Sequence, residues 1–259
     1  MASEDTQQSP WTRPGFLAAA VVVVGIAVAA IVLSVLALTR EDDPGDTAAP
    51  APDPSASQTS GTDPAPASAS PSPAAEEETE DSVCGLSGVE TDGRLSTAPE
   101  AEWEYQGTTA YPVSTEFGPA ETSDEGYRYC FQHTPEGALL AASNAVTQAT
   151  DPATVGPWLE YFLADGPAKE QILAQGGELT SAEGVRLSIA GFRMLGYDGE
   201  TATVDVAMEA SGQGQQIILS AVYTLAWEDG DWKLQVTDPT VPFDVSTLPD
   251  LSGYVAWGA

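Results

Sequence analysis

The sequence predicts an α+β domain in which helices pack on one face of a curved antiparallel sheet, preceded by one transmembrane helix and a disordered linker. Three observations lead to this fold class: a 23-residue segment without charge near the start, a long stretch after it without large apolar side chains, and a later change from helical to strand periodicity. We expect residues 1–15 to form a cytoplasmic tail, 16–38 the transmembrane helix, 39–82 the linker, and 83–259 the extracytoplasmic domain.

The segment from Phe16 to Leu38 reads FLAAAVVVVGIAVAAIVLSVLAL. At a rise of about 1.5 Å per residue it is roughly 35 Å long, which is enough to cross a bilayer core of about 30 Å. A cleaved signal peptide is the alternative, but its apolar core is usually roughly 7 to 15 residues long. Arg13 and Arg40 flank the span equally and do not set its orientation. We place the N-terminus in the cytoplasm because everything that can fold follows the span.

The linker composition is almost wholly Asp, Glu, Pro, Ala, Ser, Thr and Gly from residue 41 to 82. Without aromatic or large aliphatic side chains it cannot offset the entropy lost on ordering, so we expect a flexible tether. The acidic run at residues 76–81 fits a solvated, self-repelling end of this tether better than a metal-binding patch.

The excess of acidic over basic residues limits the kinds of molecule that the protein can bind. The chain has 39 acidic and 8 basic residues, a formal net charge of −31. A nucleic-acid backbone would be repelled, so we exclude direct DNA or RNA binding and expect cationic partners.

Two cysteines, Cys84 and Cys130, both follow the predicted span. In an oxidising exterior we expect them to form one disulfide, worth about 4 kcal/mol in the chain-entropy model. A zinc site would require four ligands, neither cysteine has a CxxC neighbour, and His133 is the only imidazole. We therefore expect no metal and no cofactor.

The first elements of the domain can be placed from periodicity and capping. Apolar residues alternate between residues 103 and 117, which predicts one or two short strands ending at Gly118–Pro119. Thr134 as N-cap and Pro135 at the first helical position predict an amphipathic helix that ends at Asp151–Pro152. A second helical region follows, interrupted at Gly166–Pro167 and ending at Gly176–Gly177.

After these glycines the period changes from 3.6 to 2. We expect four antiparallel strands, near residues 185–198, 202–209, 217–227 and 232–236, with Asp-Gly turns after the first and third. The third strand is apolar on both faces and should be central.

This order of elements over residues 134–238 resembles the NTF2-like (cystatin-like) fold, which implies a cone of curved sheet around helices. The stretch HTPEGALLAASNAV from His133 to Val146, the late tryptophans and the terminal GYVAWG from Gly253 to Gly258 resemble a family of actinobacterial membrane-anchored proteins. The layout of tail, span, linker and exterior domain is similar to VirB8- and TcpC-type components of type IV secretion machinery. No VirB8 motif matches residue by residue, so no functional residues are carried over.

The sequence offers no convincing catalytic set. His133 directly precedes the N-cap, where we expect it to pack on the first turn or bond the backbone. Asp205 and Glu209 share one strand face and could act as acid and base, but alternation predicts that this face is solvated. The Gly212–Gly214 cluster lacks a Walker lysine and a following helix, so we interpret it as a hairpin loop. We therefore expect a protein that is not an enzyme.

Three aromatic residues, Trp158, Tyr254 and Trp257, are candidate contacts to a partner or to a ligand pocket, with core packing as the alternative. For the tail from Pro239 to Ala259 we favour packing back onto the domain over a hook presented to a partner. Our leading hypothesis is a single-pass membrane protein that serves as a structural or assembly component of a conjugation or type IV secretion-like apparatus, with protein partners or copies of itself. The alternative is a ligand-binding or sensing module that uses the cone pocket for a lipid or cell-wall fragment.

Overall fold

The computed structural model describes residues 82–174, 185–212, 214–242 and 244–259. The predicted cytoplasmic tail (1–15), the transmembrane helix (16–38) and all but the last residue of the predicted linker (39–82) lie outside these ranges. Among the residues that the structure describes, no helix is long and apolar enough to cross a membrane.

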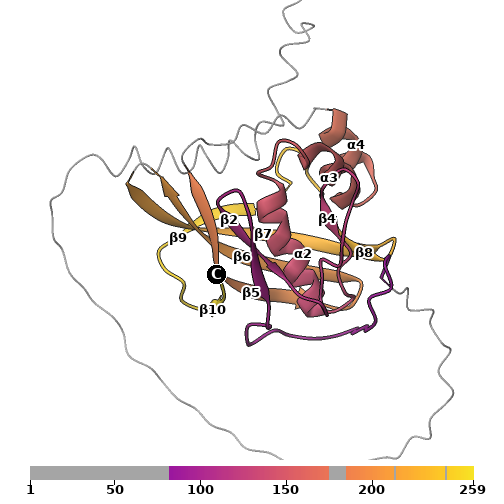
Figure 1. Cartoon of the computed structure of the whole chain (residues 1–259), viewed down its shortest axis with the longest axis horizontal. Coiled ribbons are helices and arrows are strands. Elements are labelled where there is room, and N and C mark those ends of the chain that lie inside the picture. The colour runs from indigo at the N-terminus through magenta and orange to yellow at the C-terminus, as the bar shows by residue number, and fades with distance from the viewer. Residues whose placement is uncertain (1–81, 175–184, 213, 243) are drawn as a thin grey trace, which may run out of the picture.

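The described residues form a sheet-rich domain with three helices and antiparallel sheets (Figure 1). The helices are α2 (Pro135–Gln148), α3 (Val155–Phe162) and α4 (Pro167–Ala174). The strands are β1 (Glu102–Gln106), β2 (Thr109–Val113), β3 (Glu121–Thr122), β4 (Arg128–Tyr129), β5 (Arg186–Tyr197), β6 (Thr201–Gly212), β7 (Gln215–Glu228), β8 (Asp231–Leu234), β9 (Asp244–Leu248) and β10 (Val255–Ala256). The helices predicted between residues 134 and 174 and the long strands are confirmed, whereas the short strands β3, β4, β9 and β10 were not predicted. The predicted end of the second helical region at Gly176–Gly177 lies outside the described residues.

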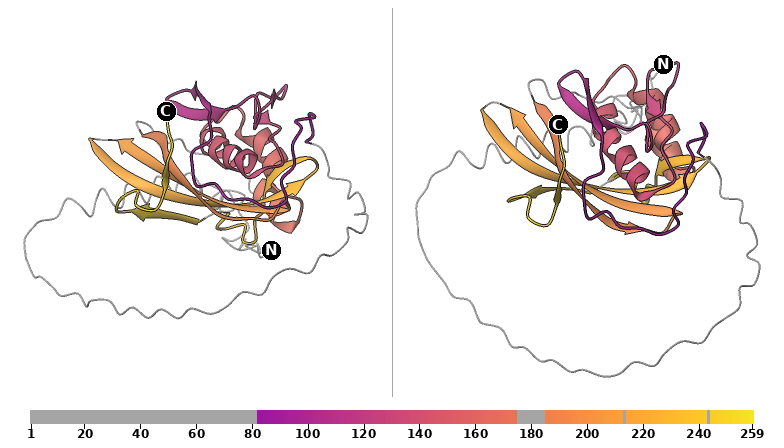
Figure 2. Two further views of the ribbon diagram at one scale, coloured as in Figure 1. Left: turned by 90° about the horizontal axis from the view of Figure 1, so that it is seen from below. Right: turned by 60° about the horizontal axis from the view of Figure 1, so that its bottom comes forward.

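The main sheet has the strand order β10-β5-β6-β7-β8, with β9 also pairing with β7, and every pair is antiparallel. Strand β7 has neighbours on both sides, as its apolar sequence predicted. Irregularities at Ile189–Gly191 and Met194–Gly196 in β5 are bulge-like shifts of register. Such bulges bend a strand and increase its twist, and Figure 2 shows the resulting curved sheet with the helices and the β1–β2 hairpin on one face.

The predicted Asp-Gly turns are present. Asp229 and Gly230 both have positive φ, 55° and 76°, which is the geometry that a two-residue turn between twisted strands requires. At the β5–β6 turn the Asp198 carboxylate accepts a hydrogen bond from the Thr201 backbone at 2.6 Å. These two turns fix the register of the strands that they join.

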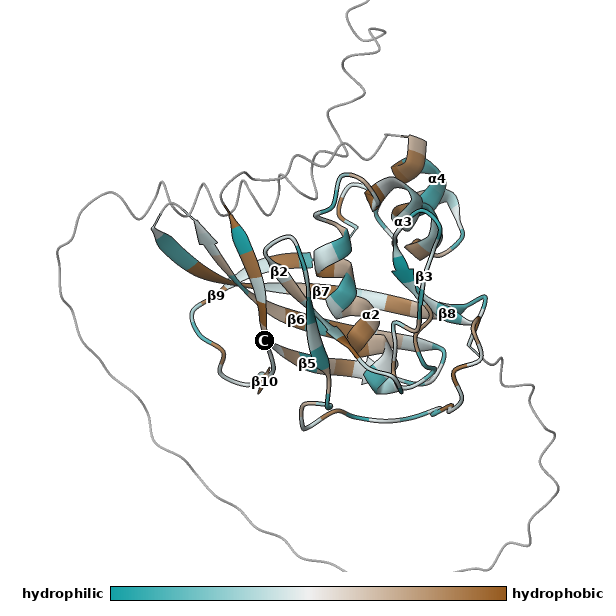
Figure 3. Ribbon diagram, in the orientation of Figure 1, coloured by the Kyte–Doolittle hydropathy of each residue, from teal (hydrophilic) through white to brown (hydrophobic). Residues whose placement is uncertain are grey.

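Helix α2 begins as predicted, because the Thr134 hydroxyl caps it by accepting from the Gly137 backbone at 3.1 Å. The prediction of one apolar face was too narrow, since every α2 residue except Glu136 is buried. The sheet covers one side of the helix, and β2 and β4 contact it as well. Figure 3 shows hydrophobic residues gathered along α2 and the part of the sheet beneath it.

The tail after β8 packs back onto the sheet, which confirms the favoured alternative. It supplies β9 and β10, and Trp257 is only 7% exposed. Two glycines permit this close approach: a Cβ on Gly191 would lie 2.8 Å from the Val255 carbonyl oxygen, and one on Gly258 would lie 2.4 Å from that of Ile189. Both contacts are closer than real Cβ atoms approach, so neither position accepts a side chain without movement of the backbone.

Candidate binding groove

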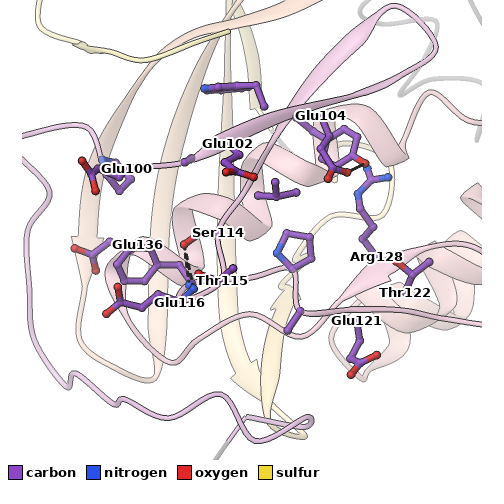
Figure 4. A pocket seen from close by; sticks show the side chains of 18 of the residues that line it. Glu100, Glu102, Glu104, Ser114, Thr115, Glu116, Glu121, Thr122, Arg128 and Glu136 are labelled. Atoms are coloured by element: carbon purple, nitrogen blue, oxygen red, sulfur yellow. Dashed lines mark hydrogen bonds between the residues drawn. The ribbon is translucent and has the colours of Figure 1, made fainter.

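A surface groove of about 1320 Å³ lies between the β1–β2 hairpin, the segment 114–122, the start of α2 and the end of the tail (Figure 4). We call it the acidic groove. Its carboxylates belong to Glu100, Glu102, Glu104, Glu116, Glu121 and Glu136, and its only cation is Arg128. Figure 4 shows these carboxylates spread around the groove instead of gathered at one point.

This spacing decides which cation the groove suits. Within the described parts of the chain, no three His, Cys, Asp or Glu side chains come close enough to hold one metal ion. A metal requires ligands that converge at roughly 2 to 2.6 Å. Carboxylates distributed along a groove instead match positive charges distributed along an extended chain.

The one arginine of the groove is already engaged by the protein. Its Nε donates to Asn144 at 2.8 Å, its Nη1 donates to Gln106 at 2.8 Å, and its guanidinium lies 3.7 Å above the Tyr111 ring centre. The Tyr111 hydroxyl in turn donates to Glu104 at 2.7 Å. Burial lowers the pKa of Arg128, and arginine side chains in proteins remain charged at neutral pH. Arg128 therefore fixes the hairpin on α2 and leaves the other groove carboxylates unneutralised.

Glu136 is the half-buried carboxylate of this set, in the first turn of α2. Its pKa is raised, chiefly by desolvation and further by repulsion from Glu90 and Glu116. A cation placed in the groove would attract the ionised carboxylate and offset the repulsion from Glu90 and Glu116, so ionisation of Glu136 and binding of a cation favour each other.

The aromatic part of the groove comes from two segments far apart in sequence. Trp103 of β1 lies edge-on to Trp257 of the tail, with ring centroids 5.1 Å apart. Trp257 also packs against Phe192 in the core, and its indole Nε1 donates to the Pro99 carbonyl at 3.2 Å. The tail thus holds the chain leading into β1 in place.

Residues 117–120, which we call the floor of the groove, are hydrogen bonded to the segment just before α2. The Gln132 backbone donates to Phe117 at 3.1 Å, and the Ala120 backbone donates to Cys130 at 3.0 Å. Gly118 lies between these contacts at a φ of 98°, where a Cβ would meet the Cys130 carbonyl oxygen at 2.5 Å. Only glycine fits this position.

A buried carboxylate, Asp231, orients this supporting segment. It accepts from the backbones of Cys130 at 2.7 Å and Phe131 at 2.9 Å, and from the Tyr161 hydroxyl at 2.8 Å. Burial raises the pKa of Asp231, while these hydrogen bonds oppose the rise. Sequence reasoning missed Asp231, Arg128 and the six groove glutamates. The alternation of Glu100, Glu102 and Glu104 was a local signal for three of them, whereas the others join the groove only through the fold.

The cysteines and aromatic residues that the sequence predicted as site residues lie in different parts of the domain. The expected disulfide joins Cys84 to Cys130, with a Cα–Cα distance of 6.0 Å, next to the floor of the groove. Trp158 lies in the core at 4% exposure, stacked on Phe162. Tyr254 lies against the sheet, hydrogen bonded to Asp205, and does not line the groove. Of the three candidate aromatic contacts, Trp257 alone lines the groove.

His133 packs beside the helix start, as expected. Its ring stacks on Trp227 at a centroid distance of 4.0 Å, and its Nε2 is hydrogen bonded to the Gly199 carbonyl. Burial lowers its pKa, which favours the neutral ring.

The expectation of a solvated strand face at Asp205 and Glu209 is wrong for Asp205, which is 0% exposed. Asp205 forms an ion pair with Arg193 and accepts from Ser220 at 2.6 Å and from Tyr254 at 2.8 Å. Tyr254 comes from the tail, which covers this part of the sheet. The periodicity of one strand cannot predict that a segment about 50 residues later in the chain will pack over one of its faces.

Residues 63–256 match the family described as a domain of unknown function (DUF8175). No curated protein and no solved structure matches the chain. The matched region includes every residue that lines the groove except Trp257, and both cysteines. Because it spans most of the sequence, the chain belongs to the DUF8175 family.

Proposed function

We propose that the chain is a non-enzymatic, membrane-tethered assembly protein whose folded domain binds a basic segment of a partner protein in the acidic groove. The observation that carries this proposal is the set of six groove glutamates opposed by one arginine that the protein itself already uses. A groove lined with one sign of charge attracts the opposite sign and speeds its association.

The aromatic side chains beside these carboxylates support a protein partner. Trp103 is partly exposed and lines the same groove as Glu102 and Glu104, whereas the buried Tyr111 ring is already covered by Arg128. Lysine and arginine present an apolar stem and a charged head, and they pack well on aromatic rings next to carboxylates. A basic peptide segment combines both features along its whole length.

The tether and compartment of this proposal rest on the sequence. The uncharged segment 16–38 supports a transmembrane anchor, and the Cys84–Cys130 disulfide supports an oxidising exterior. The order of helices followed by antiparallel strands supports assignment to the NTF2-like fold. The layout of tail, span, linker and domain supports a place in a conjugation or type IV secretion-like apparatus, as one component among protein partners or copies of itself.

The alternative of a lipid or cell-wall ligand inside a cone has less support. Such a ligand needs free space between the helices and the sheet. Side chains of α2 and of the sheet fill that region, including the fully buried Leu139, Phe192 and Leu219. The acidic groove would also repel the anionic groups common to lipids and wall polymers.

The test uses the full chain in an uncharged detergent and a labelled octapeptide of alternating lysine and threonine. Glu102→Gln, Glu116→Gln and Glu121→Gln combined should weaken binding about five- to tenfold, because exposed ion pairs are worth roughly 0.3 to 0.5 kcal/mol each. Added salt should weaken binding to the unaltered chain and reduce this difference.

The matched control is the triple variant Glu160→Gln, Glu170→Gln and Glu200→Gln, which removes the same charge from exposed positions outside the groove. Its binding should stay within about twofold of the unaltered chain. Equal losses in the two triple variants would mean that attraction is nonspecific, and would overturn the proposal, as would an unaltered chain that does not bind the peptide.

A further inference from the structure

The β1–β2 hairpin has one occupied edge and one open edge. In its register Trp103 faces Pro112 and Tyr105 faces Ala110. The Pro112 carbonyl accepts from the Asn144 side chain of α2 at 2.9 Å, so it points away from β1. In an antiparallel pair, two facing residues direct their backbone groups either toward each other or both outward. Trp103 therefore also directs its N–H and C=O outward, on the far side of β1.

The same alternation places the backbone groups of Tyr105 on that outer edge, two residues further along. No hydrogen bond from the described residues reaches the backbone N–H or C=O of Trp103 or Tyr105. The edge is accessible, since Glu102, Glu104 and Tyr105 are all exposed, Tyr105 at 67%. It is also fixed in place by the Arg128 contacts that hold the hairpin on α2.

We propose that the partner's basic segment binds as an added β-strand on the outer edge of β1. This inference rests on the proposed function and specifies its geometry. A strand on this edge would form main-chain hydrogen bonds with Trp103 and Tyr105, and alternate side chains would lie next to Glu102 and Glu104 on the groove face. Lysine or arginine at every second position would place its charge beside these carboxylates.

Charge identifies the occupant of this edge. A second copy of β1 would bring like-charged glutamates opposite Glu102 and Glu104, which disfavours pairing between copies. The chain's own residues 41–81 contain eleven acidic residues and no lysine or arginine, so they are repelled as well. An edge that could otherwise pair with any exposed strand is thereby selective for a basic strand from another protein.

The test compares the lysine–threonine octapeptide with an analogue of equal charge that is N-methylated at two adjacent central residues. This change removes backbone donors on both edges of the peptide. Only one of the two methylated positions can face β1, so binding to the full chain should fall about fivefold, as expected for the loss of one main-chain hydrogen bond. Hydrogen exchange should show new protection of the Trp103 and Tyr105 amides when the unmodified peptide binds.

A matched pair of variants tests the same edge from the protein side. Tyr105→Pro removes one outward N–H at an edge position that tolerates proline, whereas Tyr105→Ala removes the side chain and keeps the N–H. The proline variant should bind about fivefold more weakly than the alanine variant.

The outcomes separate the two proposals. If the methylated analogue binds as well as the parent peptide and the edge amides gain no protection, strand addition is wrong. The groove proposal still stands in that case, provided that the groove triple variant weakens binding. If the unmodified peptide does not bind, both proposals fall. The methylated analogue requires no altered protein, so a folding defect in Tyr105→Pro would not blur the result.

Discussion

At the scale of single residues, the acidic groove places a carboxylate in an environment that opposes its charge. Glu136 is partly desolvated and lies near Glu90 and Glu116, both of which raise its pKa. Its position in the first turn of α2 acts in the opposite direction, because a helix N-terminus favours negative charge. The raised pKa shows that desolvation and repulsion outweigh the helix.

This balance predicts a pH dependence of stability. An acid whose folded pKa is raised binds its proton more tightly in the folded state, so its ionisation lowers the free energy of unfolding as pH rises above about 4. Glu136→Gln removes that loss. The variant should unfold on the order of 1 to 2 °C higher than the unaltered chain at pH 7 and at the same temperature at pH 4.

Glu170→Gln is the matched control, since Glu170 is an exposed glutamate in the first turn of α4. It should give no gain at pH 7, because it loses only a favourable contact with a helix N-terminus. Thermal unfolding followed by circular dichroism at the two pH values provides the measurement. If Glu136→Gln lowered the unfolding temperature at pH 7, or raised it no more at pH 7 than at pH 4, the prediction would be wrong.

At the scale of elements, Asp205 joins three strands and the tail. It lies on β6 and receives hydrogen bonds from Arg193 on β5, Ser220 on β7 and Tyr254 beside β10. The pair is asymmetric, with the arginine side chain 40% exposed and the aspartate 1% exposed. The hydrogen bond to Asp205 raises the pKa of Arg193, and Arg193 also stacks on the Tyr254 ring at 4.2 Å.

We therefore expect Asp205→Ala to destabilise the domain by about 2 to 4 kcal/mol, because three donors lose their acceptor at a largely buried site. Glu209→Ala on the same strand face should change stability by less than about 0.5 kcal/mol, since Glu209 accepts only an exposed hydrogen bond from the Gln216 side chain among the described residues. Urea unfolding of both variants measures the difference. Similar losses in the two variants would show that the contacts of Asp205 contribute little.

At the scale of the whole molecule, the groove depends on segments brought together from both ends of the domain. The Cys84–Cys130 disulfide ties the start of the described chain to the segment under the groove floor. Trp257 ties the tail to Trp103 and to the chain before β1. The hairpin that carries Glu102 and Glu104 is thus held by contacts with α2 and with the tail, and the disulfide holds the segment under the groove floor.

Closing this 46-residue separation with a disulfide should contribute about 4 kcal/mol through the smaller entropy of the unfolded chain. Reduction should lower the urea midpoint of the unaltered chain by the corresponding amount. The double variant Cys84→Ala with Cys130→Ala should unfold at the lower midpoint whether or not reductant is present. A midpoint that does not respond to reductant in the unaltered chain would contradict this prediction.

Local rules accounted for much of this domain. The Thr134–Pro135 start of α2, the Asp229–Gly230 turn and the apolar third strand were predictable because each depends on neighbouring residues in the chain. The burial of Asp205 and of every α2 residue except Glu136 was not predictable, because the groups that cover them come from remote segments. The hydrophobic periodicity of a helix or strand indicates which of its faces is buried in a core. It does not show which other segments of the chain will pack on its remaining faces.

The sequence by itself determined the order of helices and strands, the strongly acidic character, and the only pair of cysteines that could form a disulfide. The tertiary structure alone decided where the acidity is concentrated. Glu102, Glu116 and Glu136 lie up to 34 positions apart and face one groove only because β1, the segment after β2 and the start of α2 are packed together. Electrostatic interactions depend on distance in space, whereas sequence patterns report only neighbours along the chain. Folding brings these distant glutamates close together, so only the tertiary structure shows the groove.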